Sequence, residues 1–264
     1  MTTDVVTYLR ETALLTWRSL RAIPRVPERI LDVTIQPVVF VLLFRYVFGS
    51  ALHVGVKDYA DYLMPGIVGQ GLAFGMIGTG VATSHDMAEG VLDRFRSMPV
   101  KRLSIVSGQV FGQYCEQILG LCVYIALGLI VGWHPRFTLG TGLEFVGLLL
   151  LALLAFTWAG AFFGMLVRSP DAMQGVGFIV IFPLSFIAGV FVPISGMGLI
   201  LRTLGNWDPI SALVAANRYL ADGIPSHGSW LLSHAELAML LWSLLLLAVF
   251  VPLALRRFNH TLAS

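Results

Sequence analysis

Six long apolar runs constrain this chain more than any other feature of its sequence. A helix needs about 20 apolar residues to cross the roughly 30 Å hydrocarbon core of a bilayer. The runs lie near residues 30–49, 62–84, 103–132, 143–167, 173–192 and 231–255. A segment that crosses lipid must satisfy its own backbone hydrogen bonds, and none of the runs alternates as a barrel strand would. The sequence therefore predicts an all-α integral membrane protein with six transmembrane helices in a single domain, 1–264.

The composition argues against several other functions. Hydrophobic residues make up 57% of the 264 residues and charged residues only 12%, whereas about 25% of a soluble domain is charged. The net charge of +2 gives no reason to expect nucleic acid as a partner. Neither of the two lysines, Lys57 and Lys101, stands in a G-x-x-x-x-G-K-[ST] loop, so the chain is not expected to bind ATP phosphates itself.

Catalytic and metal-binding patterns are also missing from the sequence. It has no paired carboxylates and no Ser/His/Asp arrangement, so the chain is not expected to be an enzyme. Its six histidines are scattered, which predicts no metal site. Cys115 and Cys122 lie about 10 Å apart along one helix, at 1.5 Å per residue. That separation is too long for a disulfide, and we expect buried, unreactive thiols.

Lysine and arginine are divided unequally between the two sides of the predicted spans, and such residues gather on the cytoplasmic side of membrane proteins. One side carries Arg10, Arg18, Arg21, Arg25, Arg29, Arg94, Arg96, Lys101, Arg102, Arg168, Arg256 and Arg257. The other side carries Lys57, Arg136, Arg202 and Arg218. Both termini and the loop 85–102 are therefore predicted to be cytoplasmic. The rich use of Leu, Ala, Gly and Arg, with few Lys, points to a bacterium and hence to its inner (plasma) membrane.

Residues 5–22 are predicted to form an amphipathic helix. Its apolar residues recur at spacings of three and four and share one face: Val6, Leu9, Ala13, Trp17 and Leu20. Glu11, Arg18 and Arg21 lie opposite. This pattern is typical of a helix that lies in the cytoplasmic membrane interface. The alternative is a cytosolic helix packed on protein.

The segment between the fifth and sixth runs, residues 193–228, is apolar but interrupted by proline and glycine. Its two helical pieces, near 197–204 and 209–222, are too short to cross a bilayer. Asp208 can cap the second piece, with Pro209 at its first position. We therefore expect an external helical hairpin that re-enters the outer leaflet before the last span.

The stretch "DMAEGVLDRFRSMPVKR" (86–102) is the most charged part of the chain, with seven charged residues among seventeen. At helical spacing, an apolar face is formed by Met87, Val91, Leu92 and Phe95. Two interpretations stay open from the residues alone. The segment is either a simple turn at the membrane surface or a docking surface for a partner protein, whose register the charges would set.

Four polar residues stand inside the apolar runs and mark a possible substrate pathway: Glu116, Gln70, Gln174 and Arg45. Glu116 lies about 20 Å along its helix, near the bilayer middle, where an ion is costly. It is either a functional polar or proton-linked group, or a protonated or hydrogen-bonded glutamate between helices. Arg45 is close enough to the outer end of its run to reach the interface.

Glycine pairs at G-x-x-x-G spacing also occur inside the runs. They are Gly71/Gly75, Gly108/Gly112, Gly128/Gly132 and Gly160/Gly164. With 27 glycines in the chain, some such pairs arise by chance. The spacing permits close helix contacts but does not define a dimer face.

Two motifs resemble those of ABC type-2 permeases. "DMAEGVLDRFRSMPVKRLSIVSGQVFG" (86–112) is similar to the family's segment with D-M-x-x-G, R-F-R-x-M-P and a basic pair before the third span. "GVFVPISGM…WDPISALVAANR" (189–218) is similar to its exit from the fifth span. The nearest resemblance is to daunorubicin-resistance-type drug exporters and nodulation lipo-oligosaccharide exporters, and it covers nearly the whole chain.

The resemblance implies the permease subunit of an ATP-driven exporter for a drug, lipid or glycolipid. Two ATPase subunits would bind ATP and Mg, this chain would hold no cofactor, and the permease would pair with a second copy of itself. Residues 86–98 would form the coupling helix that contacts the ATPase, through Met87, Glu89, Val91, Leu92, Arg94, Phe95 and Arg96.

Two other functions are kept as alternatives. A proton-coupled secondary transporter would use Glu116 as its proton site, although no paired broken spans in related halves are present. A membrane assembly factor or receptor that transports nothing is the third hypothesis.

Overall fold

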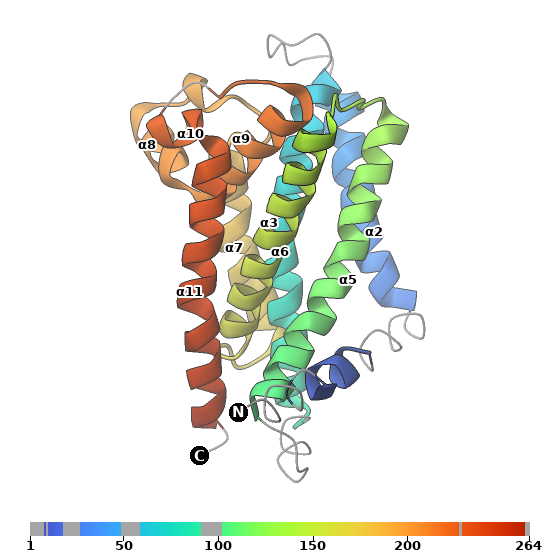
Figure 1. The fold of residues 1–264 in the computed structure, drawn as a ribbon, viewed down its shortest axis with the longest axis vertical. Helices are drawn as coiled ribbons and strands as arrows, with labels where there is room; N and C mark the ends of the chain where they lie inside the picture. Colours follow the sequence, from blue (N-terminus) through green and yellow to red (C-terminus); the bar gives the residue numbers. More distant parts are fainter. Residues whose placement is uncertain are drawn as a thin grey trace.

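The computed structural model describes residues 8, 10–17, 27–48, 59–90, 102–226 and 229–261. All secondary structure in these ranges is helical (Figure 1). The long helices are α2 (Pro27–Leu42), which continues as the π-helix η2 (Leu43–Phe48), α3 (Tyr59–Ala88), α5 (Arg102–Val131), α6 (Leu139–Gly164), α7 (Pro170–Ile187) and α11 (Ala235–Thr261). The short helices are η3 (Ile194–Gly196), α8 (Leu199–Trp207), α9 (Pro209–Asp222) and α10 (Trp230–Ser233).

Each predicted apolar run coincides with a long helix. Five helices are long and apolar enough to cross a membrane, namely α3, α5, α6, α7 and α11. The first run forms a shorter apolar helix, Thr34–Val47, and its last residues are wound as a π-helix, which the sequence did not predict. The multi-pass membrane class is therefore confirmed, while a sixth crossing by α2 stays a prediction.

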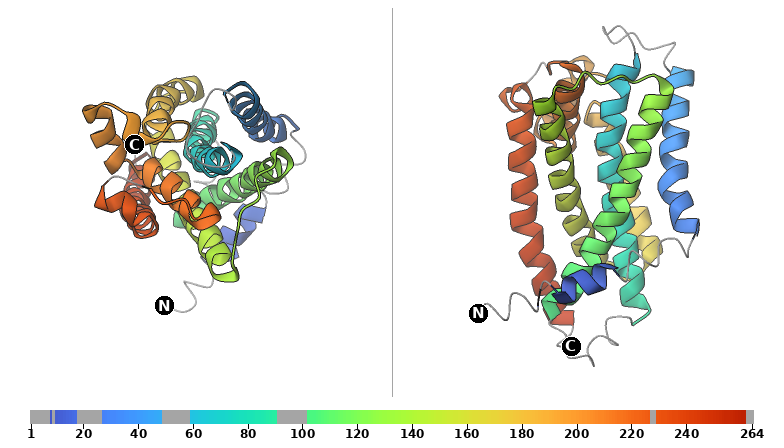
Figure 2. Two further views of the ribbon diagram at one scale, coloured as in Figure 1. Left: turned by 90° about the horizontal axis from the view of Figure 1, so that it is seen from above. Right: turned by 45° about the vertical axis from the view of Figure 1, so that its right-hand side comes forward.

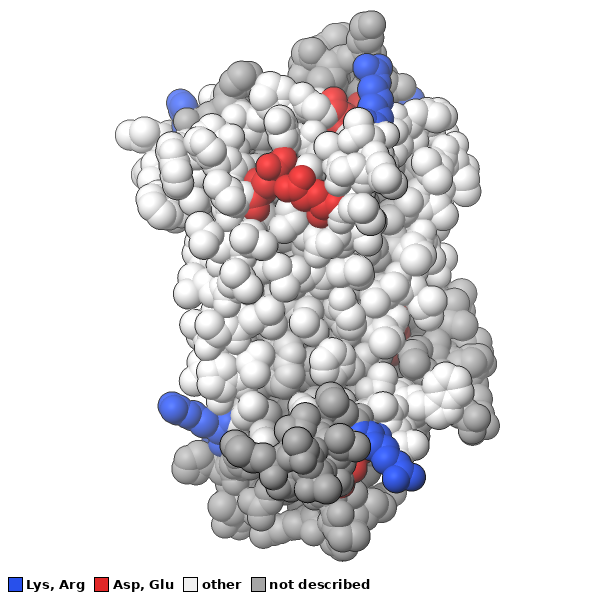
Figure 3. All heavy atoms as spheres, in the orientation of Figure 1, with Lys and Arg blue, Asp and Glu red and all other residues white. Residues whose placement is uncertain are grey.

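The long helices run side by side along the molecule, and both ends of the bundle carry further helices (Figure 1). We term α8, α9 and α10 the cap, and the opposite end, where α11 ends, the base. Figure 2 shows residues 10–17 as a helix lying across the bundle at the base. The face in Figure 3 carries its charged side chains near the cap and the base, with a nearly uncharged band between them, as a bilayer-embedded surface requires.

The N-terminal helix attaches to α5 through a mostly polar edge. The hydroxyls of Tyr8 and Ser107 are 2.7 Å apart, and Ser104 Oγ donates a hydrogen bond to Glu11 Oε2 at 2.8 Å. Trp17 remains 55% exposed on the outside of the helix. The helix is thus packed on protein along one edge, and its tryptophan is exposed enough to reach a membrane interface.

Local capping fixes where several helices begin and end. Thr138 forms a capping box with Thr141 at the start of α6, and Ser169 caps α7 directly before its first proline. Asp208 accepts the backbone N–H of Ser211 at 3.1 Å, which confirms it as the predicted cap of α9. The helix then ends at Gly223, whose φ of 66° is open to glycine without strain. The predicted bounds 209–222 match α9.

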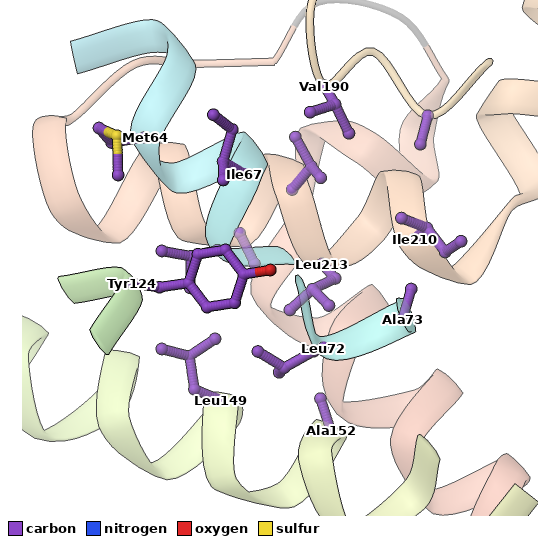
Figure 4. Packing of buried hydrophobic residues seen from close by; sticks show 14 of the residues in the cluster. Met64, Ile67, Leu72, Ala73, Tyr124, Leu149, Ala152, Val190, Ile210 and Leu213 are labelled. Carbon is purple, nitrogen blue, oxygen red and sulfur yellow. The ribbon is translucent and has the colours of Figure 1, made fainter. Parts of the chain in front are cut away.

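The central helix of the bundle is α3, which packs against α2, α5, α6, α7 and α9. In the most apolar stretch of each helix, 72% of the residues of α3 are buried inside the protein, against 67% for α6 and 22% for α5, α7 and α11. Figure 4 shows Leu72 and Ala73 of α3 among Leu149 and Ala152 of α6 and Leu213 of α9. The bundle is therefore organised around α3.

The glycine pair Gly160/Gly164 of α6 lies close against the backbone of α3. A Cβ on Gly160 would overlap the carbonyl oxygen of Met76, and a Cβ on Gly164 would overlap that of Gly80. Both obstacles are backbone atoms, which cannot turn aside as a side chain can. This G-x-x-x-G pair therefore serves a contact within one chain.

We predict that Gly160→Leu strongly destabilises the folded bundle, because its side chain must push α6 away from α3. Overpacking of this kind costs typically 1–3 kcal/mol or more. The matched control is Gly147→Leu on the same helix, since Gly147 is exposed and has nothing within 4 Å of its Cβ position. Thermal unfolding of the purified proteins in detergent measures both. Equal melting temperatures for the two variants would show that the α3–α6 contact is not critical.

Candidate functional site

The base end of α3 carries the start of the predicted coupling segment. Asp86 and Met87 belong to the last turn of α3, and Gly90 follows with a φ of 64°. The described part of the predicted coupling segment, residues 86–90, is thus the end of α3 and the turn that follows it. Met87 is partly buried against a hydrophobic cluster at the base, so it packs within the chain, while Glu89 is 60% exposed. The other predicted contact residues lie outside the described ranges: Val91, Leu92, Arg94, Phe95 and Arg96.

A hydrogen bond joins the two helices that flank this segment. Gln109 Nε2 on α5 donates to Asp86 Oδ2 on α3 at 2.6 Å. An amide–carboxylate bond is charge-assisted and stronger than a bond between neutral groups. The two arms of the loop are therefore tied together where they leave the bundle.

A second polar contact joins α3 and α5 deeper in the bundle. Gln117 Nε2 donates to the carbonyl oxygen of Gly75 at 2.9 Å and to the hydroxyl of Thr79. Gly75 leaves the room, since a Cβ there would overlap the Gln117 side chain. One turn toward the cap, Gly71 leaves room for the ring of Tyr124, since a Cβ there would overlap the ring. The glycine pair Gly71/Gly75 is therefore also occupied within the chain.

The four predicted pathway residues come from four different elements and differ in their surroundings. Gln70 on α3 is only 2% exposed, and its amide nitrogen has no hydrogen-bond partner among the described residues. Gln174 on α7 is exposed, while Glu116 on α5 and Arg45 in η2 are half-buried. A cavity of about 400 Å³ lies at the cap, between α9 and the start of α11, and none of the four lines it.

The thiols differ from the expectation in one respect. Both cysteines are free, as predicted, but only Cys115 is partly covered, whereas Cys122 is exposed on α5. The sequence could not distinguish these positions, because a helix face turned to lipid is as apolar as one turned to protein. The described residues include no group of three His, Cys, Asp or Glu side chains that could hold a metal ion.

A buried arginine on α9 is the most connected polar residue of the cap. Arg218 is 6% exposed. Its Nε donates to the carbonyl oxygen of Tyr62 at 2.9 Å, and one terminal nitrogen donates to the carbonyls of Gly189 and Val190 at 2.9 and 2.8 Å. The guanidinium also lies 3.6 Å from the centre of the Tyr62 ring. One side chain thereby connects α9 to the first turn of α3 and to the residues that follow α7.

Two of the carbonyls that Arg218 binds, those of Gly189 and Val190, lie directly after the end of α7. The last carbonyls of a helix have no intrahelical partner and carry the negative end of its dipole. After α7 the chain turns at Gly189, whose φ is 74°, and its carbonyl also accepts the Tyr62 hydroxyl at 3.1 Å. Burial lowers the pKa of Arg218, but an arginine in a protein keeps its proton. A cation therefore offsets the exposed end of the α7 dipole.

Neighbouring residues complete this arrangement, which we term the Arg218 clamp. Asn217 Nδ2 donates to the carbonyl of Pro65 at 3.2 Å. A Cβ on Gly66 would lie 2.9 Å from the Val190 oxygen and 3.0 Å from an Arg218 nitrogen, so only glycine leaves room here. The sequence places Arg218 only among the external basic residues and in the second motif. The signal that it missed is a cation inside an otherwise apolar short helix.

Two carboxylates of the cap are also shielded from water. Burial raises the pKa of Asp208 to about 6, against the opposing effect of its hydrogen bonds to the start of α9. Burial likewise raises the pKa of Asp222 to about 6. Its Oδ2 accepts the indole N–H of the fully buried Trp133 at 3.0 Å, which ties the end of α9 to the segment after α5.

Comparison with known proteins identifies the family. The model of the ABC-2 type transporter family matches residues 10–220. The daunorubicin resistance ABC transporter permease of Streptomyces coeruleorubidus is 28% identical over 248 residues, which cover 92% of this chain and 84% of that protein. The doxorubicin resistance ABC transporter permease of Mycobacterium tuberculosis is 28% identical over 148 residues, which cover 52% of this chain and 50% of that protein. The resemblance found in the sequence motifs is thereby confirmed.

We predict that Gln117→Leu lowers the free energy of unfolding by roughly 0.6–1.7 kcal/mol, the range for hydrogen bonds between helices in a membrane. Thr79 retains its own bond to the Gly75 carbonyl, so no buried acceptor is stranded. Gln174→Leu is the matched control, because Gln174 is exposed. Unfolding in detergent is the measurement. A control that loses as much stability as Gln117→Leu would contradict the proposed importance of the α3–α5 bridge.

Proposed function

This chain belongs to the ABC-2 type transporter family, and from that premise we propose that it is the membrane-spanning half of an exporter whose ATP is hydrolysed by a separate subunit. Two permease copies would assemble with two ATPase subunits in a bacterial plasma membrane. The base would face the cytoplasm, with both termini on that side. The first apolar run would cross as a sixth span through α2, and the N-terminal helix would lie in the inner interface.

The observation that carries this proposal is the position of the charged segment 86–102. It connects α3, the most buried long helix, to α5, and the bond between Asp86 and Gln109 ties the two together at the loop. A force applied to the segment would therefore move the centre of the bundle. This is what a permease driven by an external motor needs, and the sequence carries no phosphate-binding loop of its own.

The substrate that we propose is a hydrophobic or amphiphilic compound. The nearly uncharged band of Figure 3 and the scarcity of charge in the spans suit such a molecule better than an ion or a free sugar. The names of the two relatives refer to resistance to daunorubicin and doxorubicin, so a drug is the first candidate and a lipid or glycolipid the second. The cap would form the outer closure, with α8 and α9 re-entering the outer leaflet.

A proton-coupled transporter using Glu116 is the weaker alternative. Family membership points to an ATP-driven machine, and Glu116 is half-buried on α5. Glu116→Gln separates the two hypotheses. Efflux that depends on ATP and persists in this variant supports the ABC permease, whereas efflux that depends on the proton gradient and disappears in it supports the alternative.

We predict that the double charge reversal Arg94→Glu/Arg96→Glu lowers the rate of ATP-driven efflux at least about tenfold. The loop that carries these residues could then no longer dock on the ATPase subunit in the correct register. The measurement is daunorubicin transport into inverted vesicles that contain the permease and its co-purified ATPase. The control is Arg168→Glu/Arg256→Glu, which alters two exposed arginines at the base but outside the loop. Efflux that is unchanged in the Arg94/Arg96 variant while the ATPase remains bound would contradict the proposed coupling role.

A further inference from the structure

We propose that Arg218 is a positioning residue that holds the cap closed on α3 and α7 and must release it once in each transport cycle. The holding role follows from the geometry alone. The release step rests on the proposed export function. Arg218 acts on the pathway through the cap helix α9, without touching the substrate itself.

The first argument is that the clamp joins distant parts of the chain through one group. Arg218 lies 156 positions from Tyr62 and 29 from Gly189. Its three hydrogen bonds and its ring contact are made by a single guanidinium, whose planar fork a lysine cannot reproduce. Loss of this one group therefore loosens α9 from two helices at once.

The second argument concerns what happens when the clamp opens. The hydrogen-bond acceptors of Arg218 are backbone carbonyls, which are neutral. Separating a buried ion pair leaves two unpaired charges, but here only one charge is involved and it moves toward water. Water can accept the hydrogen bonds that Arg218 donates in place of each carbonyl, and the carbonyl oxygens can accept hydrogen bonds from water. The contact is therefore strong when dry and separable when the outer end hydrates, as a reversible closure requires.

The third argument is that the clamp leaves no room for a substrate. Arg218 is 6% exposed, and the fit around Gly66 is too close for even one added carbon. A change at Arg218 is thus expected to alter how often the cap opens and closes, and not how tightly substrate binds. The maximal rate of efflux should change while the substrate concentration for half-maximal rate stays the same. A general loss of structure would instead reduce the amount of folded protein.

The experiment uses a reporter cysteine under the cap. Ser211→Cys places a thiol of similar size at a position on α9 that is 1% exposed, in a background where Cys115 and Cys122 are changed to serine. Proteoliposomes hold the permease and its ATPase with the cap outward and ATP sealed inside. A membrane-impermeant maleimide added outside then measures how often the cap lifts. Daunorubicin serves as the transported test compound.

The expected result is a labelling rate at rest that rises about tenfold or more in Arg218→Gln. The matched control Arg202→Gln, which removes an exposed arginine of the same cap, should label like the unsubstituted protein. Turnover of ATP with daunorubicin should raise labelling of the unsubstituted protein toward that of Arg218→Gln. Arg218→Lys should lower the maximal efflux rate at least about threefold and leave the half-saturating concentration unchanged.

Two results would overturn the proposal. Equal labelling at rest of Arg218→Gln and Arg202→Gln would remove the holding role, and unsubstituted vesicles that export daunorubicin without any rise in labelling would remove the release step. If the unsubstituted protein exports nothing with its ATPase, the proposed function fails, but the comparison at rest still decides the holding role. If Arg218→Gln does not fold, Gly66→Ala replaces it. The added methyl group would press on the contacts of Arg218 and should also raise the labelling rate at rest. A labelling rate that does not rise would count against the clamp.

Discussion

Close packing of backbones onto α3 is the constraint on which the rest of this structure depends. In lipid, apolar side chains gain little by leaving their surroundings, so helices associate through close van der Waals contact and hydrogen bonds. Here Gly160 and Gly164 of α6 lie against α3 carbonyls, and Gly71 and Gly75 of α3 receive side chains of α5. Helices α5 and α6 are thereby positioned against α3 by contacts that a larger residue would block.

The same helix connects the two ends of the molecule. Its 30 residues extend from Tyr59 near the cap to Ala88 at the base, a length of about 45 Å at 1.5 Å per residue. At the base, Asp86 is bonded to α5, and in the first turn the Tyr62 carbonyl is bonded to Arg218. A displacement of the loop after α3 therefore has a short physical route to the cap, through one packed helix with a polar contact at each end.

How far the sequence predicts this structure depends on which physical signal each feature leaves. Helix lengths and helix ends leave clear signals in the sequence. The apolar runs therefore matched the long helices, and Asp208 with Pro209 marked the start of α9. The exposure of a side chain leaves no such signal, because lipid and the protein interior select the same residues. For this reason the prediction that Cys122 is buried was wrong. The Arg218 clamp was missed because its partners are backbone carbonyls, which every residue possesses. The turn at Gly90 and the π-helix in η2 depend on backbone winding that apolar periodicity does not encode.

The occupied glycines also bear on how two copies could meet. Each of the four G-x-x-x-G pairs has at least one glycine covered from within the chain. Gly108 receives Leu15 of the N-terminal helix, Gly128 receives Trp133 and Met64, and the pairs that join α3 to α5 and α6 are filled as described above. A G-x-x-x-G dimer needs both glycines free, so that a partner backbone can approach. A second copy would therefore use other surfaces. Broad apolar side chains remain exposed on α7, where Ile179 is 75% exposed, and on α2, where Ile35 is 54% exposed. Contact between copies on such faces would rest on side-chain packing and would leave the glycine-mediated contacts around α3 intact.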